Sequence, residues 1–245
     1  MIRWLAVMGA MAAGLLVGGC AGDGPVPSYP ALVPAEALTL IADRQASIVT
    51  VTAECDLELT DARGQTVSLD GVLVASLTPP TRLRLRAWKF GTTVFDLTLT
   101  GGKAWAMVPD SGPAAGKVDL QNMPARRVSD AFELLGPAYF RGATVVRENT
   151  TTLVVRGTAL GRDDVLCEID RPTLTARRFV VGDGGSMSEL LLDSYTLSDA
   201  GPVWPKMLLL RSPMGKVAVT MREIEVNGEV PPEAFIPPRR AVELR

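Results

Sequence analysis

The sequence predicts a mainly β protein of the α+β class, in which a strongly curved antiparallel sheet forms an unclosed half-barrel with a helical lid. Two observations lead to this expectation. About a dozen segments alternate apolar and polar residues, which is typical of strands with one buried face. Only two segments have helical spacing, which is too few to cover a flat sheet. Such a sheet must close into a barrel, pair as a sandwich or curve around a cover, and the curved form accommodates both helices.

The clearest strand lies at residues 49–59, where every odd position is apolar and every even position is polar or charged. Residues 82–87 alternate arginine with leucine or alanine. The short spacing and the Gly or Pro turn residues favour antiparallel meanders over βαβ units. Further strands are expected at 67–77, 94–100, 103–108, 142–148, 151–158, 164–170, 174–181, 189–197, 205–211 and 215–225.

Two helices are expected, at residues 35–47 and 129–135. The first has apolar residues at helical spacing, and Pro34 stands where a helix start tolerates proline. In the second, Ser129 is placed to cap the N-terminus, and Gly136-Pro137 is expected to stop the helix.

The first residues of the chain predict export and lipid attachment. Residues 5–17 are apolar or glycine, too short to span a bilayer comfortably but suited to the core of a secretory signal peptide. The segment ends in Val17-Gly18-Gly19-Cys20, which resembles the bacterial lipobox. In that motif an aliphatic and two small residues precede a cysteine that is freed by cleavage and acylated. The alternative is an ordinary secreted protein with a chance cysteine at its cleavage site.

These features divide the chain into four parts. We expect a lipoprotein signal peptide at 1–19, an acylated cysteine and flexible tether at 20–34, one domain at 35–238 and a C-terminal tail at 239–245. The lipobox resemblance implies an outer-membrane location facing the periplasm, because Ala21 rather than Asp follows the cysteine. In a source with a single membrane, the anchor would lie in the cell membrane.

The composition excludes several classes of function. The 245 residues include 25 Lys and Arg against 27 Asp and Glu, so the basic excess needed for nucleic-acid binding is absent. The chain contains no histidine, which excludes Ser-His and Cys-His nucleophile pairs and HExxH zinc sites. Neither GxSxG nor SxxK occurs. We therefore expect no catalytic residues, no cofactor and no metal site, and a hydrolase is the weakest function considered.

Several segments together carry a family resemblance. They are the lipobox, the tether, the N-terminal helix, the strand 49–59, the Pro-Pro-Thr-Arg-Leu-Arg-Leu-Arg segment at 79–86, the hairpin 88–95 and the closing segments 224–228 and 231–237. In this order they resemble the LolA/LolB-type lipoprotein carriers and their uncharacterised lipoprotein relatives. The resemblance implies an unclosed β-barrel with a helical lid around a cavity that binds acyl chains.

The lipid anchor makes the membrane-tethered receptor LolB a better match than the soluble carrier LolA. The resemblance implies acyl chains or a lipoprotein as cargo, the membrane as anchor site and a periplasmic carrier protein as partner. LolB-type receptors also carry an exposed apolar loop residue that helps to deliver cargo. The nearest candidates here are Met107, Val108 and Met123, beside an expected long loop at 109–127.

A cavity for acyl chains needs an extensive apolar lining. A sixteen-carbon chain at ~0.8 kcal/mol per CH₂ requires on the order of 10 kcal/mol of apolar contact. The alternative is that the same side chains pack on one another as a dry core. The candidate lining residues on the strands and helices are Leu38, Ile41, Leu57, Leu59, Leu83, Leu85, Phe95, Leu97, Leu99, Phe132 and Leu135.

Two charged sets each allow more than one interpretation. Arg82, Arg84 and Arg86 share one strand face and either meet acidic lipid headgroups or keep an outer face soluble. The carboxylates of Glu54, Asp56 and Glu58 would be ~7 Å apart along a strand, a spacing that suits either paired carboxylates, calcium binding or a solvated face.

Cys55 and Cys167 both occupy apolar positions of expected strands. Export to an oxidising compartment permits a disulfide between them, and two buried free thiols are the alternative.

Together these observations predict a lipid-anchored periplasmic protein that binds acyl chains or a lipoprotein in an apolar cavity. The alternative is a non-catalytic envelope sensor or scaffold on the same fold, with the cavity small or occluded.

Overall fold

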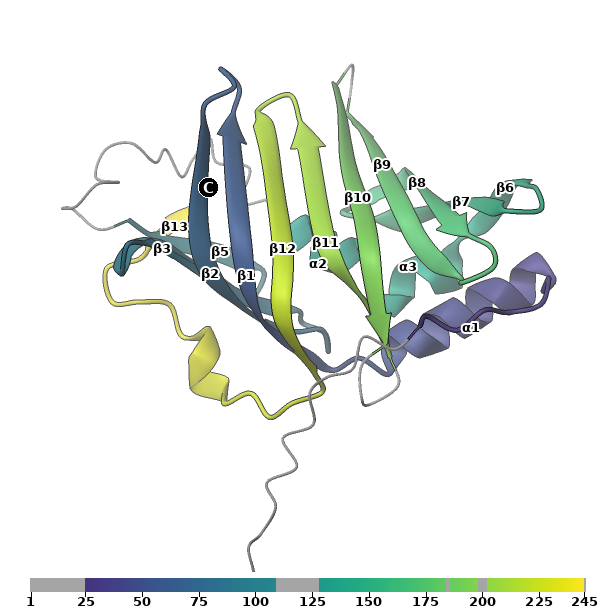
Figure 1. The fold of residues 1–245 in the computed structure, drawn as a ribbon, viewed down its shortest axis with the longest axis horizontal. Coiled ribbons are helices and arrows are strands. Elements are labelled where there is room, and N and C mark those ends of the chain that lie inside the picture. The colour runs from purple at the N-terminus through teal and green to yellow at the C-terminus, as the bar shows by residue number, and fades with distance from the viewer. Residues whose placement is uncertain (1–24, 109–127, 184–185, 198–201, 245) are drawn as a thin grey trace, which may run out of the picture.

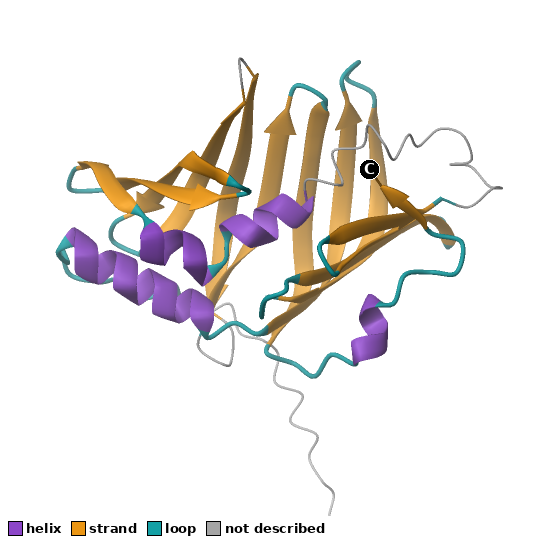
Figure 2. Ribbon diagram, turned by 180° about the vertical axis from the view of Figure 1, so that it is seen from behind, coloured by secondary structure: helices purple, strands orange, loops and turns teal. Residues whose placement is uncertain are grey.

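The computed structural model describes residues 25–108, 128–183, 186–197 and 202–244. Within these ranges the chain forms one antiparallel sheet of 13 strands, with helices packed on its concave side (Figures 1 and 2). The sheet is strongly curved and unclosed, since strands β13 and β6 lie at its two ends. The predicted fold class is confirmed.

The strands follow the predicted segments closely. Their order across the sheet is β13-β5-β4-β3-β2-β1-β12-β11-β10-β9-β8-β7-β6. Their bounds are β1 Thr50–Asp61, β2 Thr66–Ser76, β3 Arg82–Lys89, β4 Thr92–Thr100, β5 Lys103–Met107, β6 Thr144–Glu148, β7 Thr152–Ala159, β8 Arg162–Asp170, β9 Thr175–Asp183, β10 Ser186–Leu197, β11 Val203–Ser212, β12 Gly215–Val226 and β13 Val242–Leu244.

Two meanders, β1–β5 and β6–β12, make up most of the sheet, and they join where β1 pairs with β12. This pairing runs from Val51 opposite Val226 to Asp61 opposite Gly215. A contact between strands so far apart in sequence makes one continuous sheet out of two local units. The first and last long strands therefore lie side by side at its centre (Figure 1).

Alternation decides which side chains each strand buries. In β1, Val51, Cys55 and Leu57 are fully buried, whereas the intervening carboxylates face outward. In β3, Leu83 and Leu85 are fully buried on the concave face and the three arginines lie on the convex face. A continuous apolar surface therefore lines the inside of the curve.

Three α-helices are described: α1 Pro34–Ala46, α2 Val128–Leu134 and α3 Pro137–Gly142. The predicted stop at Gly136-Pro137 is confirmed, since α2 ends at Leu134, but α3, which was not predicted, begins directly afterwards. Gly136 is extended and Pro137 occupies the first turn of α3, where its missing N–H costs nothing. Helix α2 also begins one residue before Ser129, so the predicted cap residue lies inside it.

Two segments expected to lie outside the domain are part of it. The predicted tail contains β13, which pairs with β5 and extends one end of the sheet. Part of the predicted tether is docked, since the Tyr29 N–H donates to the Pro172 carbonyl at 2.7 Å and Arg171 donates to the Leu32 carbonyl at 3.0 Å. A strand of three residues and a docked coil carry too little periodicity to be recognised in the sequence.

Helix α3 is fixed by a buried tyrosine. Tyr139 is 1% exposed, and its hydroxyl donates to the carbonyl oxygens of Val155 (3.4 Å) and Val165 (3.0 Å) on β7 and β8. Burial raises the pKa of Tyr139 above its ordinary value. The ring lies on Gly157 of β7, where an added Cβ would stand 2.8 Å from the Tyr139 Cε2 atom. A side chain at position 157 would therefore displace the helix.

We expect Gly157→Ala to lower the free energy of unfolding by ~1–3 kcal/mol through overpacking against Tyr139. Gly142→Ala is the matched control, because nothing lies within 4 Å of its added Cβ and the residue ends α3. Urea denaturation of both variants measures the difference. Equal stability of the two would show that Tyr139 does not pack tightly on β7.

Candidate functional site

The residues predicted to line a cavity lie together on the concave side. Those on β1, β3 and β4 form the inner face of one half of the sheet, and those on α1 and α2 face the interior from the helices. All except Leu99 belong to one buried cluster, and Leu99 packs against that cluster while partly exposed. The candidate residues therefore lie in or against one buried apolar cluster.

The interior is closely filled. Leu57, Leu83, Leu85 and Phe95 are 0% exposed, and the most exposed of the ten buried candidates, Leu38, reaches 8%. Side chains with so little exposure contact other protein atoms on all sides. An acyl chain can enter such a surface only by displacing some of these contacts.

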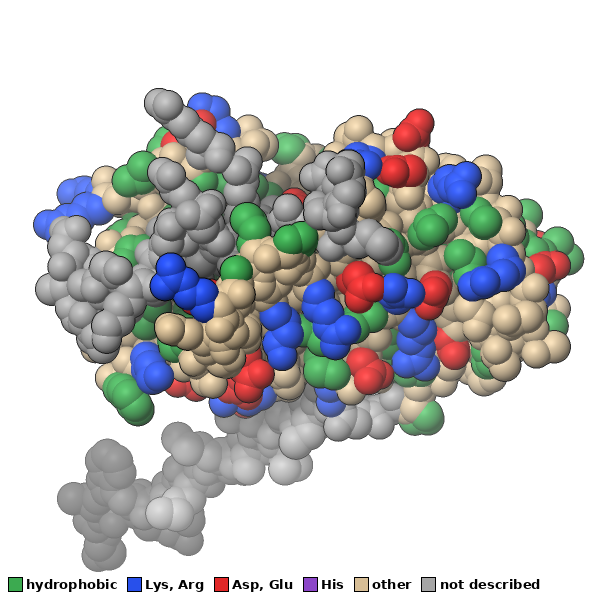
Figure 3. Space-filling model, turned by 90° about the horizontal axis from the view of Figure 1, so that it is seen from above, with side chains coloured by type: hydrophobic (Ala, Val, Ile, Leu, Met, Phe, Trp, Pro, Cys, Tyr) green, Lys and Arg blue, Asp and Glu red, His purple; other side chains and the backbone are tan. Residues whose placement is uncertain are grey.

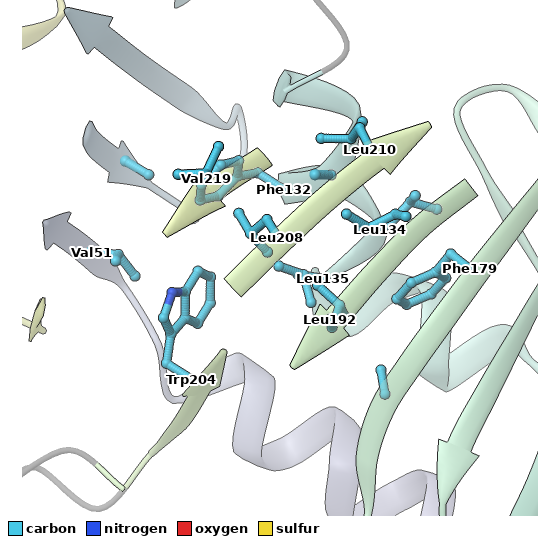
Figure 4. Close-up of a cluster of buried hydrophobic side chains, with 14 of the residues drawn as sticks. Val51, Phe132, Leu134, Leu135, Phe179, Leu192, Trp204, Leu208, Leu210 and Val219 are labelled. Atoms are coloured by element: carbon cyan, nitrogen blue, oxygen red, sulfur yellow. The ribbon is translucent and has the colours of Figure 1, made fainter. Parts of the chain in front are cut away.

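Helix α2 covers the centre of the concave face. Its Phe132 ring lies 6.0 Å from the Trp204 ring of β11, and Figure 4 shows Leu134 and Leu135 beside Leu208 of the same strand. In the last turn of α2, the Glu133 carboxylate accepts a hydrogen bond from the Leu160 N–H in the β7–β8 turn at 2.6 Å. Packing and one polar contact to a hairpin thus hold a helix of seven residues.

Helices α1 and α3 pack on each other beside the β6–β8 end of the sheet, and α3 contacts β7 (Figure 2). Arg44, near the end of α1, donates to the carbonyl oxygens of Thr173 and Leu174 in the β8–β9 turn. Tyr29 and Leu32 are hydrogen-bonded to the same turn, so one hairpin positions both α1 and the segment that leads to it.

The convex face of β3 and β4 is covered by a short 3-10 helix, η2 (Pro232–Phe235). Arg84 binds both carboxylate oxygens of Asp96, at 2.9 and 2.8 Å, and donates to the Ala234 carbonyl at 3.1 Å. Asp96 is 1% exposed, and this pairing raises the pKa of the Arg84 guanidinium. Arg82 lies over the Phe235 ring at 4.7 Å.

Neither interpretation of the arginine set describes Arg84, which holds the C-terminal segment to the sheet. Among the outward carboxylates of β1, Asp56 pairs with Arg222 at 3.1 Å. The described residues contain no group of three or more acidic or sulfur ligands suited to a metal ion. Figure 3 shows acidic and basic side chains interspersed on the face seen from above, as expected for a solvated surface.

Solved structures share this architecture along most of the chain. They include a domain described as an outer membrane lipoprotein-sorting protein from Vibrio parahaemolyticus, a DUF1329 family protein from Desulfovibrio piger and a LolA superfamily protein from Nitrosomonas europaea. Their TM-scores are 0.57, 0.57 and 0.56, at 10%, 10% and 7% identity. The alignments cover 83%, 84% and 81% of this chain and 97%, 98% and 97% of those chains.

The protein has a LolA-like fold. The resemblance seen in the sequence is thus confirmed at the level of architecture. Neither a family model nor a curated protein sequence matches the chain.

In this LolA-like fold the most exposed large apolar side chain of the described residues is Phe90, at 90%. It lies in the β3–β4 hairpin with φ of 51°, a left-handed conformation that is an outlier for a bulky residue. Met107 and Val108, two of the predicted loop candidates, are partly buried, and Val108 packs against the core. The third, Met123, lies outside the described residues, as does the segment 109–127. Alternation carries no signal for Phe90, because the conformation of the β3–β4 turn sets its exposure.

The lipobox residues Val17, Gly18, Gly19 and Cys20 also lie outside the described residues. Within the described part of the chain, no helix is long and apolar enough to cross a bilayer.

Cys55 and Cys167 are free and buried. They lie on β1 and β8, with β12, β11, β10 and β9 between them in the sheet, whereas a disulfide needs Cα atoms within about 7 Å. The structure therefore matches the free-thiol alternative. Burial raises the pKa of the Cys55 thiol to about 12, with a further contribution from Asp56, and raises the pKa of Cys167 well above 9.0.

We expect both thiols to resist an aromatic disulfide reagent at pH 8 in the native protein and to react once it is unfolded. Unfolded thiols lose their protons near pH 9.0, whereas the folded Cys55 retains its proton to about pH 12. The contribution of the protonated Cys55 thiol to the free energy of unfolding is therefore complete below pH 9 and falls as the pH rises toward 12. Denaturation midpoints measured between pH 9 and pH 12 test this fall in stability. Peptide mapping without reductant tests the free thiols, and a Cys55–Cys167 disulfide would contradict them.

Proposed function

We propose that the protein is a lipid-anchored envelope lipoprotein that binds the acyl chains of a lipid or lipoprotein between its curved sheet and its helices, as an acceptor of the LolB type. The continuous apolar inner face, covered by only three described α-helices, carries the proposal. The LolA-like fold supports it, because one protein that shares the fold is described as a lipoprotein-sorting domain. No catalytic step is proposed.

Entry of an acyl chain requires the helices to separate from the sheet. Helix α2 is the element best suited to move, since seven residues are held mainly by Phe132, its apolar neighbours and the Glu133–Leu160 contact. An acyl chain that enters makes new apolar contacts in place of the lost side-chain contacts, and each buried CH₂ group contributes ~0.8 kcal/mol of binding free energy. Contacts between apolar side chains and contacts between side chains and an acyl chain are similar in kind, so the free energies lost and gained nearly balance.

The lipobox supports attachment at Cys20. Nine residue steps separate Cys20 from Tyr29, which is hydrogen-bonded to the β8–β9 turn. Even a fully extended chain of this length spans only about 30 Å. Acylation of Cys20 would therefore keep the domain, and the α1 end of it in particular, close to the membrane surface.

Phe90 supports a delivery role. An aromatic residue that is almost fully exposed and held at positive φ contributes little to the core and strains its own turn. Lys89 stands beside it, with its ammonium group 5.6 Å from the ring centre. A basic residue next to an exposed aromatic side chain suits contact with an anionic lipid surface.

The filled interior favours a second candidate function. Because most of the inner residues are fully buried, the same fold can serve as a tethered sensor or scaffold that uses its outer surface. The two functions differ in whether lipid occupies the interior.

Mass spectrometry of the mature protein tests the first function directly. Under denaturing conditions we expect the added mass of three acyl chains on Cys20. Under native conditions, after release from detergent micelles, we expect further non-covalent lipid that reappears when palmitoyl lipid is added to stripped protein. A protein with an acylated Cys20 and no non-covalent lipid would favour the scaffold; an unmodified Cys20 would refute the anchor.

Replacing Phe90 separates delivery from folding. Phe90→Asn is expected to preserve the free energy of unfolding, because asparagine tolerates positive φ, while slowing transfer of a fluorescent diacyl lipopeptide to phosphatidylethanolamine–phosphatidylglycerol vesicles. Met214→Asn is the matched control, since Met214 is also an exposed apolar residue in a hairpin turn. Identical transfer rates for the two variants would exclude a specific role for Phe90.

A further inference from the structure

Trp204 lies at the centre of the concave face, at the start of β11. It is 0% exposed and is the largest of the fully buried side chains. Its ring faces that of Phe132 from α2 at 6.0 Å and an interplanar angle of 31°. Figure 4 draws it below Leu208 and near Val51.

The indole N–H of Trp204 has no hydrogen-bond partner within the described structure. A buried donor left without an acceptor costs as much as a lost hydrogen bond, so an orphan in a core calls for an explanation. The Phe132 ring does not supply one, because two rings tilted by only 31° cannot direct an in-plane N–H at a ring face. The Thr196 hydroxyl, on the residue paired with Trp204, is directed to the Leu197 carbonyl.

An apolar track leads away from this donor. Leu208 and Leu210 lie on the same face of β11 as Trp204, with the partly buried Lys206 between Trp204 and Leu208, and Val219 of β12 is paired with Leu208. The distance from position 204 to position 210 along a strand is about 20 Å. This length is comparable to that of an extended sixteen-carbon chain. A neutral donor at one end of a mostly apolar track suits a long apolar molecule with one acceptor.

The acceptor must be neutral. An ionised carboxylate brought beside Trp204 would lose its hydration and gain only one neutral donor, which is strongly unfavourable. Lys206, the next residue on this face of β11, is already engaged in an interaction of its own. A carbonyl oxygen of an ester or amide loses far less on burial and accepts a hydrogen bond well.

We infer that Trp204 Nε1 donates a hydrogen bond to the carbonyl oxygen of an acyl ester or amide, with the acyl chain lying along Leu208, Leu210 and Val219. The inference rests on the proposed acyl-chain binding and adds to it the chemical class of the linkage recognised. A plain hydrocarbon would fill the same track without satisfying the donor.

A matched pair of ligands isolates the carbonyl. Ethyl palmitate and icosane have the same number of heavy atoms, but only the ester can accept a hydrogen bond. The full mature protein, with ¹⁵N-labelled indole groups, is held in nanodiscs of ether-linked phosphatidylcholine, which contains no carbonyl group. Titration with ethyl palmitate should move the Trp204 indole proton resonance downfield, icosane should not, and Trp88 and Trp105 should remain unchanged with both.

Competition between the two ligands gives a second measurement. Wild-type protein should prefer the ester by about 2–10-fold, the range of one neutral hydrogen bond, and Trp204→Phe should remove this preference while still binding both. Trp105→Phe, on the outer face of β5, is the control and should keep it. Binding of both ligands with no ester preference and no Trp204 shift would overturn the inference alone. Failure of both ligands to bind would instead refute the proposed function.

Discussion

The structure depends on one constraint: a wide sheet with a single apolar face has too few helices to cover it flat. Thirteen strands in one unclosed sheet present their apolar side chains to the same side, and the described helices number only three. Curvature solves this problem, because a bent sheet encloses part of its own inner surface and reduces the area the helices must cover. The pairing of β1 with β12 makes this possible by joining two meanders into a continuous curve. Either meander alone would expose its apolar face along one long edge.

The two halves of the sheet are stabilised differently. On the β3–β4 side, the convex face is also covered, since η2 lies over the Arg84–Asp96 ion pair and β13 extends the edge. A buried charge pair of this kind resists separation, because removing either partner leaves an uncompensated charge. On the other side, α1 and α3 pack on each other, and α2 is held mostly by apolar contacts. Apolar contacts are not directional, so helices can shift over such a surface more readily than η2 can leave its ion pair. The elements that are easier to displace therefore belong to the concave side, where a ligand would enter.

Sequence patterns located most of this structure for a simple physical reason. A strand with one buried face alternates over many residues, and the predicted strands match those observed to within a few residues at most ends. The pattern failed where the physical cause is local or tertiary. Helix α3 has only six residues, and β13 only three, so both are too short for their periodicity to be recognised in the sequence. Trp204 was missed because Pro205 marked the expected strand start, although the strand begins at Val203. The exposure of Phe90 is set by a turn conformation, which alternation does not encode.

A filled interior is compatible with a carrier on physical grounds. An empty apolar cavity open to water would leave a large apolar area hydrated, at about 25 cal/mol per Å², and would invite association between molecules. A protein that releases its ligand at a membrane therefore gains by closing onto itself when empty. When the empty protein closes, however, a buried hydrogen-bond donor can be left without a partner. The apolar side chains that fill the space of an acyl chain have no carbonyl oxygen to accept its hydrogen bond. An apolar interior that holds the unsatisfied donor Trp204 Nε1 is what an emptied acyl-ester site would leave behind. A core evolved only for stability has no use for such a donor, since phenylalanine fills similar space without its cost.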